Sequence, residues 1–370
     1  MLGENSFQSF ESGIQMQIPP LMPQYDIQQT YQWNYENVPK PVSQEQLAVP
    51  GRWSFCGLPV SSPLGIPAGP LLNGKWVLYY ASLGFDVLTY KTVRSTSREC
   101  YPLPNLQPVD TAPLSGGTQA VKFSSEMQGS WAVSFGMPSA SPSVWQKDVE
   151  QTRKQLSADK ILSVSVVGSI QPGWSLDDLA DDYALCAQWA IQSGADCIET
   201  NFSCPNVCTQ DGQLYQQPEA AALVASRVKE VTGAIPYLIK IGHVPDIAQA
   251  QELLQAIRPY ASGIVMTNSV AASVSDQEGK PMFGGEQRGI CGIATKEASL
   301  KQLKIFAQLI QEMPDKLARP DLISCGGISS ATDVKEFLAA GAQATHLATA
   351  AMCDPQIGLK IRKVLAEQQE

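Results

Sequence analysis

Residues 176–206, LDDLADDYALCAQWAIQSGADCIETNFSCPN, contain one complete helix-to-strand unit. Leu176–Ser193 has helical periodicity, with aspartates near its start, and Gly194 just past its end closes the helix. Cys197–Thr200 is a short, apolar run of the kind found in strands buried on both faces. The stretch therefore predicts a helix that returns the chain to a buried parallel strand, which ends in a polar loop.

The same unit recurs from about residue 54 onward, so the sequence predicts an α/β fold with a parallel sheet. The other expected strands are Val87–Tyr90, Ile161–Val167, Tyr237–Ile241, Gly263–Met266, Leu322–Ser324 and His346–Ala348, with a first strand near residues 62–69. The other expected helices are Glu219–Val231, Ile247–Ala256, Leu300–Glu312 and Ala331–Ala340. A chain of 370 residues is long enough for a single (β/α)8 TIM barrel with appendages.

Two segments depart from this alternation. Residues 1–50 are rich in Gln and Pro and predict an irregular N-terminal arm that wraps the barrel or a partner. Residues 101–142 are rich in Gly, Ser and Pro and too long for an ordinary βα loop, so they predict an inserted lobe or active-site cover. We expect residues 51–370, including this insertion, to form the barrel.

Composition excludes several functional classes. The formal charge is −9 and no block of Lys or Arg occurs, which argues against nucleic-acid binding. No run of about 18 apolar residues is present to predict a membrane span, and the first thirty residues lack the pattern of a signal peptide. We therefore expect a cytoplasmic protein whose partners are small molecules or proteins.

Nine cysteines at irregular spacing fit reduced thiols better than a disulfide framework. Cys204 and Cys208 are close in sequence, but no second cysteine pair and only two histidines accompany them. A structural zinc site or an iron–sulfur cluster needs more ligands than that, so we expect no metal.

The densest polar signal is the loop Asn201-Phe202-Ser203-Cys204-Pro205-Asn206, which directly follows an expected strand. Each asparagine amide offers a donor and an acceptor, which suits a planar ligand with alternating carbonyl and N–H groups. A cysteine on such a loop can remove a proton from carbon if its thiolate is accessible. The alternative interpretation of Cys204 alone is a small buried packing residue.

Two lysines end or interrupt apolar strands. Lys91 follows Val87–Tyr90, and Lys240 lies between Ile239 and Ile241. A lysine in an apolar strand is costly to bury, so both positions indicate an anionic or electron-rich ligand such as a reduced flavin. A solvated strand end is the alternative for Lys91.

Small residues gather after several strands. Ser324–Ile328 and Leu347–Ala350 follow the expected seventh and eighth strands, where (β/α)8 enzymes often bind phosphate. Ser62–Gly69, Thr267–Ser269 and Gly289–Gly292 allow a flat cofactor to approach the backbone, although each alone is also compatible with a turn.

Taken in order from about Ser54 to Ile361, these motifs resemble the dihydroorotate dehydrogenase family, and the cysteine of the loop resembles the class 1 enzymes. The pyrimidine-binding domain of dihydropyrimidine dehydrogenase is similar. The resemblance implies an FMN-dependent flavoprotein of pyrimidine metabolism in which a base removes a ring proton while hydride passes to flavin N5. It also implies a homodimer.

Residue roles follow from the matching positions. Cys204 matches the catalytic base. Substrate contacts match Lys91, Asn201, Asn206, Asn268 and Ser269. Cofactor contacts match Ala68, Gly69, Lys91, Thr92, Asn201, Lys240, Thr267, Gly292, Cys325, Gly326, Gly327, Ala348 and Thr349.

One position departs from the family pattern. The family's Asn-x-x-Gly phrase on the long loop corresponds to residues 133–136, where this chain has Val133. Loss of that amide should remove about 1–3 kcal/mol of substrate recognition if its partner stays unpaired. The expected reaction is oxidation of dihydroorotate or a closely related cyclic amide, and the alternative is an oxidoreductase or reductase acting on another dihydropyrimidine or a specialised metabolite. Fumarate, a separate redox subunit and oxygen all remain open as electron acceptor.

Overall fold

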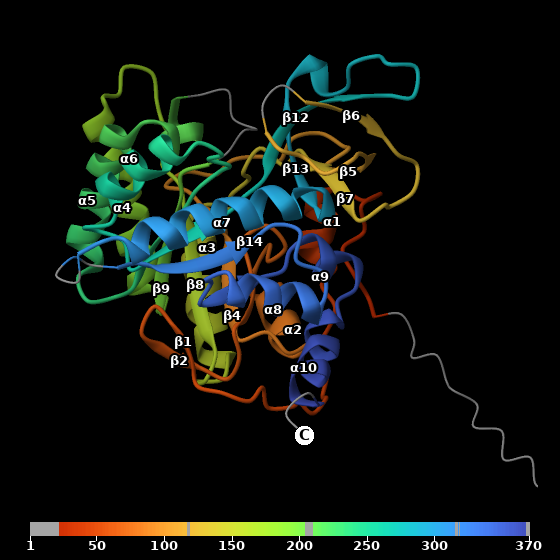
Figure 1. Cartoon of the computed structure of the whole chain (residues 1–370), viewed down its shortest axis with the longest axis horizontal. Coiled ribbons are helices and arrows are strands. Elements are labelled where there is room, and N and C mark those ends of the chain that lie inside the picture. The colour runs from red at the N-terminus through yellow and green to blue at the C-terminus, as the bar shows by residue number, and fades with distance from the viewer. Residues whose placement is uncertain (1–21, 117–118, 204–209, 315–316, 318, 368–370) are drawn as a thin grey trace, which may run out of the picture.

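The computed structural model describes residues 22–116, 119–203, 210–314, 317 and 319–367. Eight parallel strands close into a barrel, as predicted (Figure 1). In chain order the strands are β3 (Leu64–Ile66), β4 (Val87–Val93), β8 (Ile161–Val166), β9 (Cys197–Asn201), β10 (Tyr237–Lys240), β11 (Gly263–Met266), β14 (Asp321–Cys325) and β15 (Ala344–His346). Each strand pairs with its neighbours in chain order, and β15 pairs with β3 to close the circle.

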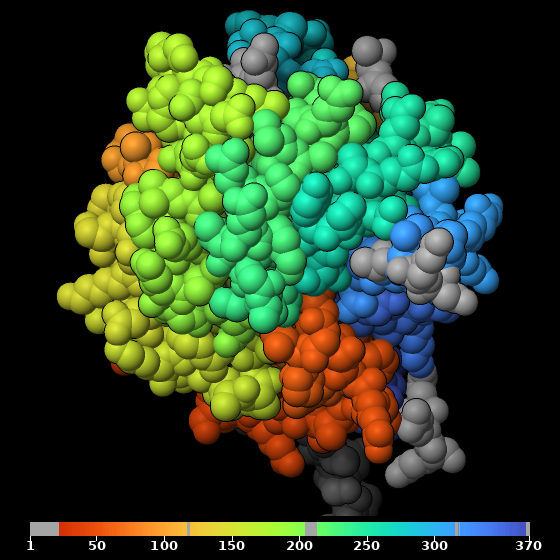
Figure 2. Space-filling view, turned by 90° about the vertical axis from the view of Figure 1, so that its left-hand side faces the viewer, coloured from red at the N-terminus to blue at the C-terminus, as the bar shows by residue number. Residues whose placement is uncertain are grey.

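A helix follows each strand and covers the outside of the barrel. These helices are α2 (Gly74–Ala81), α3 (Pro142–Gln155), α4 (Leu176–Gln192), α5 (Pro218–Thr232), α6 (Ile247–Ile257), α7 (Lys296–Gln311), α8 (Ala331–Ala339) and α10 (Ile357–Glu367), with the short α9 (Thr349–Cys353) preceding the last. Figure 2 shows the side covered by the chain from α4 to α6, which presents a continuous surface.

The predicted strand boundaries agree with the structure to within one residue except at β4 and at the last strand. β4 continues three residues beyond the predicted Val87–Tyr90, to Val93, so Lys91 lies inside the strand and not after it. The prediction His346–Ala348 is wrong by two residues, since β15 is Ala344–His346. Leu347 still donates a backbone hydrogen bond to Gly65, but Ala348 leaves the extended conformation (φ −107°, ψ −80°) to begin α9. The small residues that looked like the end of a strand are therefore the start of a helix.

An antiparallel hairpin, β1 (Trp53–Phe55) and β2 (Leu58–Val60), lies at the lower end of the barrel in Figure 1. Phe55 is buried among inward-facing side chains of the barrel strands, and together they form an apolar plug. The barrel members of this plug are Val87, Ile161, Cys197, Leu238, Val265, Ile323, Cys325 and Ala344. The hairpin thus shuts the end of the barrel opposite the polar strand-end loops.

A second, smaller barrel of five strands lies at the other end (Figure 1). It contains β5 (Leu106–Asp110), β6 (Ala120–Phe123) and β7 (Ser130–Val133) from the expected lobe. Two strands from the loop after β11 complete it: β12 (Val270–Ser275) and β13 (Arg288–Gly292). The remaining short helices are η1 (Gln210–Gln216), η2 (Phe283–Gly285) and η3 (Ile293–Thr295).

The described part of the N-terminal arm lies against α2 and contains the helix α1 (Tyr31–Glu36). The indole of Trp76 donates to the carbonyl of Asn34 at 3.0 Å, and the Asn73 amide donates to Tyr35 at 2.7 Å. Tyr31 packs against Phe135 of the lobe in a T-shaped arrangement, with 6.0 Å between ring centroids. The arm therefore joins the barrel to the lobe.

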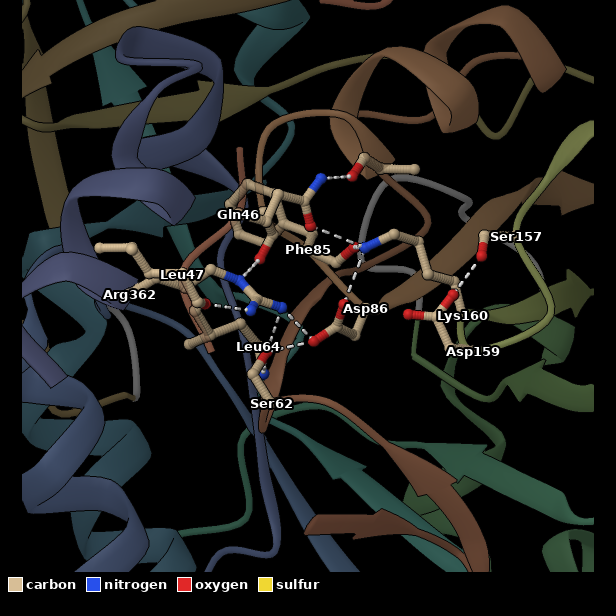
Figure 3. Close-up of polar contacts among 12 residues, drawn as sticks. Gln46, Leu47, Ser62, Leu64, Phe85, Asp86, Ser157, Asp159, Lys160 and Arg362 are labelled. Carbon is tan, nitrogen blue, oxygen red and sulfur yellow. Dashed lines mark hydrogen bonds and ion pairs between the residues drawn. The ribbon is translucent and has the colours of Figure 1, made fainter. Parts of the chain in front are cut away.

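Buried charges tie the lower ends of three adjacent barrel strands to the arm and to α10 (Figure 3). Asp86, which is 0% exposed, accepts from Lys160 at 2.8 Å and from Ser62 at 2.5 Å, and it pairs with Arg362. Lys160 and Arg362 also donate to the arm, at Gln46 and at the Leu47 carbonyl. One carboxylate thus joins the loops before β3, β4 and β8 to the last helix.

In the described residues no helix is both long and apolar enough to cross a membrane.

We predict that Asp86→Asn lowers the free energy of unfolding by about 3–5 kcal/mol, because it leaves two buried cations without their anion. Urea denaturation of the purified protein measures this loss. The control is Glu150→Gln, which breaks the exposed pair with Lys154 on α3 and should leave stability unchanged. Equal effects of the two substitutions would contradict a central role for Asp86.

Candidate functional site

A cavity of about 850 Å³ lies where the barrel strands end and the lobe begins. The ends of β4, β9, β10 and β14 contribute Lys91 and Thr92, Asn201, Lys240 and Cys325 to its wall. The carboxyl ends of parallel strands meet at one edge of a barrel, and side chains there converge on one space. The predicted strand-end residues are therefore brought together.

A second cavity of about 520 Å³ continues from the first. Both are lined by Asn268, Cys291, Cys325, Ala348 and Thr349, so they are compartments of one space. The first holds most of the lysine and amide side chains, and the second is bordered by the glycine loops. An elongated ligand would extend through both compartments.

Lys91 is held at the edge of the first compartment. It is 7% exposed, and its Nζ lies 3.3 Å from the carbonyl oxygen of Gly69 and 4.6 Å from the ring centroid of Phe135. The ring of Tyr31 lies 5.9 Å away. A carbonyl oxygen and two aromatic rings are favourable surroundings for an ammonium group, and an ammonium at this position can attract an anionic ligand.

The side-chain amides of Asn201 and Asn268 hydrogen-bond to Ser203, at the start of the polar loop 201–206. Asn201 Oδ1 accepts from the backbone N–H of Ser203 at 3.1 Å, and Asn268 Nδ2 donates to the Ser203 carbonyl at 2.7 Å. Both asparagines also line the cavity, as does Ser269. Residues 204–209 lie outside the described part of the chain, so the predicted base Cys204 and the predicted contact Asn206 are not placed. The residue just before Cys204 is fixed at the cavity by two amides.

Two other cysteines line the cavity. Burial raises the pKa of the Cys291 thiol to about 12, and burial also raises the pKa of Cys325. Both thiols are therefore protonated at neutral pH and unsuited to remove a proton.

The glycine loops border the second compartment closely. Gly326 and Gly327 have φ of 108° and 79°, and a Cβ on them would lie 2.4 Å from Ser299 Oγ and 2.5 Å from Lys296 Cα. A Cβ on Gly292 would lie 2.1 Å from the Gly129 carbonyl oxygen. Only glycine lets the backbone pack this closely against these neighbouring residues, and all three glycines also line the second compartment. Ala348 and Thr349 complete the same wall.

The loop after β3 approaches the first compartment from the other side. Ala68 and Gly69 line it, and a Cβ placed on Gly69 would meet no heavy atom within 4 Å. Thr267 differs from the other predicted cofactor contacts. Its hydroxyl donates to Gln302 of α7 at 2.9 Å, and neither compartment includes it.

The lobe supplies a wall that sequence reasoning did not assemble. Its members are apolar: Leu106, Trp131, Val133, Phe135 and Met137. Val133 had stood out as a departure from the family pattern, but nothing in the local sequence indicated that these side chains share one surface. Met352 of α9 is a further lining residue without a signal beyond its place after the eighth strand.

The donor set fits FMN. Glycines flank a space that a flat ring system can enter, the Lys240 ammonium at the end of β10 is suited to an electron-rich ring, and the second compartment has the glycine backbone and threonine hydroxyl that suit a phosphate. The residues present are therefore compatible with the predicted cofactor.

Comparisons with known proteins agree with this assignment. A sequence profile described as dihydroorotate dehydrogenase matches residues 52–368. Dihydroorotate dehydrogenase of Dictyostelium discoideum is 33% identical over 368 residues, covering 93% of this chain and 98% of that protein. The catalytic subunit of dihydroorotate dehydrogenase B (NAD(+)) of Bacillus pumilus is 32% identical, and the match covers 48% of this chain and 54% of that subunit.

Solved structures share the fold. Ligand-free dihydroorotate dehydrogenase of Eimeria tenella has a TM-score of 0.70 at 16% identity and covers 88% of this chain and 89% of that one. The same enzyme in complex with ferulenol has a TM-score of 0.65, also at 16% identity, covering 84% and 82%.

The predicted fold, family and cofactor class are thus confirmed. The profile spans most of the chain, and the Dictyostelium relative aligns over nearly its whole length. The chain belongs to the dihydroorotate dehydrogenase family, whose members are FMN-dependent oxidoreductases that act on CH–CH groups.

Proposed function

We propose that this chain oxidises dihydroorotate to orotate, with Cys204 as the base that removes a proton from the substrate ring. The observation that carries the proposal is the convergence of two lysines and two asparagines on one cavity, beside the residue that precedes Cys204. Two amides and a cation suit a ring with alternating carbonyl and N–H groups and a carboxylate.

FMN held in this cavity would supply the hydride acceptor for the oxidation. Lys91 would bind an anionic group of the substrate, because its ammonium lies at the edge of the cavity. The orientation of the substrate ring would be fixed by hydrogen bonds from four side chains, those of Asn201, Asn206, Asn268 and Ser269. Lys240, Gly326, Gly327 and Thr349 would hold the cofactor's ring and phosphate ends.

The remaining proposals rest on less direct support. We propose a cytoplasmic location because the seven described cysteines are all free, which is typical of a reducing compartment. We also propose that the protein is a homodimer, on the basis of the family resemblance.

The apolar wall of the lobe favours a second candidate. Val133 lies where the family has a substrate amide, and it is surrounded by Leu106, Trp131, Phe135 and Met137. A cyclic amide with an apolar edge would gain from this wall what it loses in hydrogen bonds. The second candidate is therefore another dihydropyrimidine or a specialised cyclic metabolite, oxidised or reduced by the same groups.

We predict that Cys204→Ala slows anaerobic bleaching of the flavin by dihydroorotate by about 10²–10⁴-fold, the usual contribution of a general base. Stopped-flow absorbance of the FMN-loaded protein measures this rate. Cys291→Ala serves as comparison and should change the rate far less, because burial keeps that thiol protonated. A Cys204→Ala enzyme that bleaches at the wild-type rate would rule out the proposed base.

We predict that enlarging Gly69 excludes FMN in steps without unfolding the protein. Gly69→Ala should bind FMN slightly less tightly, and Gly69→Leu should lose most of its FMN. The new side chain would extend into the open space of the cavity that the cofactor is proposed to occupy. Flavin absorbance per mole of protein and urea denaturation of the flavin-free form measure the two quantities. Full flavin content in Gly69→Leu would place the cofactor elsewhere.

We predict that Val133→Asn lowers the KM for dihydroorotate by up to about tenfold, the value of one hydrogen bond of about 0.5–1.5 kcal/mol. Val133→Leu, similar in size to asparagine but without an amide, should not lower it. Steady-state kinetics with an artificial acceptor measures KM. A higher KM in Val133→Asn would instead favour the second candidate, whose substrate needs the apolar wall.

A further inference from the structure

Glu199 is a buried carboxylate inside the barrel, one level below the cavity. It is 1% exposed and is the middle residue of β9. Side chains two residues apart on a strand face the same way. Cys197 below it belongs to the apolar plug, and Asn201 above it lines the cavity. Glu199 therefore lies between the plug and the cavity.

The contacts of Glu199 lead back to the cavity. Glu199 is opposite Ser165 in the pairing of β9 with β8; the Oγ of Ser165 lies 3.0 Å from the Thr92 hydroxyl, and Thr92 lines the cavity wall. The carboxylate oxygen Oε1 of Glu199 has no hydrogen-bond partner within the described part of the chain. Three other carboxylates in the described chain are buried, those of Asp86, Asp182 and Asp333. Each accepts a hydrogen bond, and none has a fully buried oxygen that lacks a partner.

In the pairing of β9 with β10, Lys240 is the cation that lies nearest to Glu199. Glu199 is opposite Leu238 and Lys240 is opposite Asn201, so the two charged residues are diagonal neighbours on the inner face. Burial raises the pKa of the Glu199 carboxyl, and the positive charge of Lys240 opposes that rise. Opposite charges on such diagonal neighbours attract each other in a water-poor interior.

Apart from Lys91, the other titratable groups described for this region carry no charge at neutral pH. Burial, aided by Lys240, lowers the pKa of His346 on β15 to about 3, so its imidazole is neutral. Burial raises the pKa values of the thiols of Cys197, Cys291 and Cys325. Lys91, on β4, has its ammonium at Gly69 and Phe135 at the edge of the cavity.

We propose that Glu199 is the counter-charge of Lys240 and that this buried pair sets the redox potential of the flavin bound above it. The inference rests on the proposed flavin cavity and assigns Glu199 as a positioning residue that acts through Lys240. The carboxylate offsets part of the positive field that the Lys240 ammonium directs at the flavin ring.

The sign of the effect follows from charge. Two-electron reduction makes the flavin more electron-rich, so a nearby negative charge disfavours the reduced form. Glu199→Gln removes that charge and should shift the midpoint potential to a more positive value. In a Lys240→Met background the carboxyl loses the cation that favours its ionised form and takes up a proton. There the Glu199→Gln substitution should produce little further shift.

The experiment is a double-mutant cycle on the FMN-loaded protein. Midpoint potentials of wild type, Glu199→Gln, Lys240→Met and the double variant are measured by anaerobic titration against a reference dye. Thr89→Val is the matched control, because Thr89 is another buried, inward-facing polar residue whose Oγ1 has no described partner, and its loss changes no charge. It should leave the potential unchanged.

A positive shift that largely disappears in the Lys240→Met background supports the pair. No shift with Glu199→Gln would show that Glu199 is not ionised, and equal shifts in both backgrounds would show that it acts without Lys240; either overturns the inference. A wild-type protein that carries no flavin would instead refute the proposed function.

A second measurement covers variants that lose FMN. Infrared spectra of the flavin-free proteins report the carbonyl band of a protonated carboxylic acid. That band should appear on going from wild type to Lys240→Met and be missing from the double variant. A band of equal strength already present in wild type, and removed by Glu199→Gln, would overturn the proposed counter-charge.

Discussion

The two-residue period of side chains along closed parallel strands determines the whole interior of this protein. On β9 the inward positions are Cys197, Glu199 and Asn201, and they lie in the plug, in the layer above it and in the cavity wall. On β10 the inward positions are Leu238 and Lys240, in the plug and in the cavity wall. A shift of one residue in β10 would place Lys240 under the outer helices and an isoleucine in the cavity.

That constraint explains why the barrel ends are so different. At the lower end, β1 and β2 close the barrel with Phe55 and an apolar plug, while Asp86 and its cations join the strand ends outside the plug. The upper end must stay open between the strands. The lobe and the arm cover it with aromatic and aliphatic side chains, and Tyr31 and Phe135 reach Lys91 from these two separate segments.

Much of the barrel could be predicted because buried strands and the glycines after helices are local signals. Strand β11 was predicted to the residue, and the amide loop after β9 was recognised as the densest site signal. The lobe strands β12 and β13 escaped because their glycines and serines resemble turns, and because their partners β6 and β7 lie more than a hundred residues away. Pairing at that distance leaves no mark on either segment. Glu199 was visible in the sequence, but a lone carboxylate gains a role only from the strand beside it.

The site separates two properties that a flavoenzyme must set. In the proposed function, substrate recognition would depend on the lobe wall, to which Val133 belongs. The buried charge below the cavity depends on inward positions of barrel strands, namely Glu199 on β9 and Lys240 on β10. The two regions meet at the cavity, where Lys91 lies over the ring of Phe135. The lobe nevertheless has its own small core around Val121, Ala132 and Ile290, so its wall can change while the buried pair below the cavity stays the same.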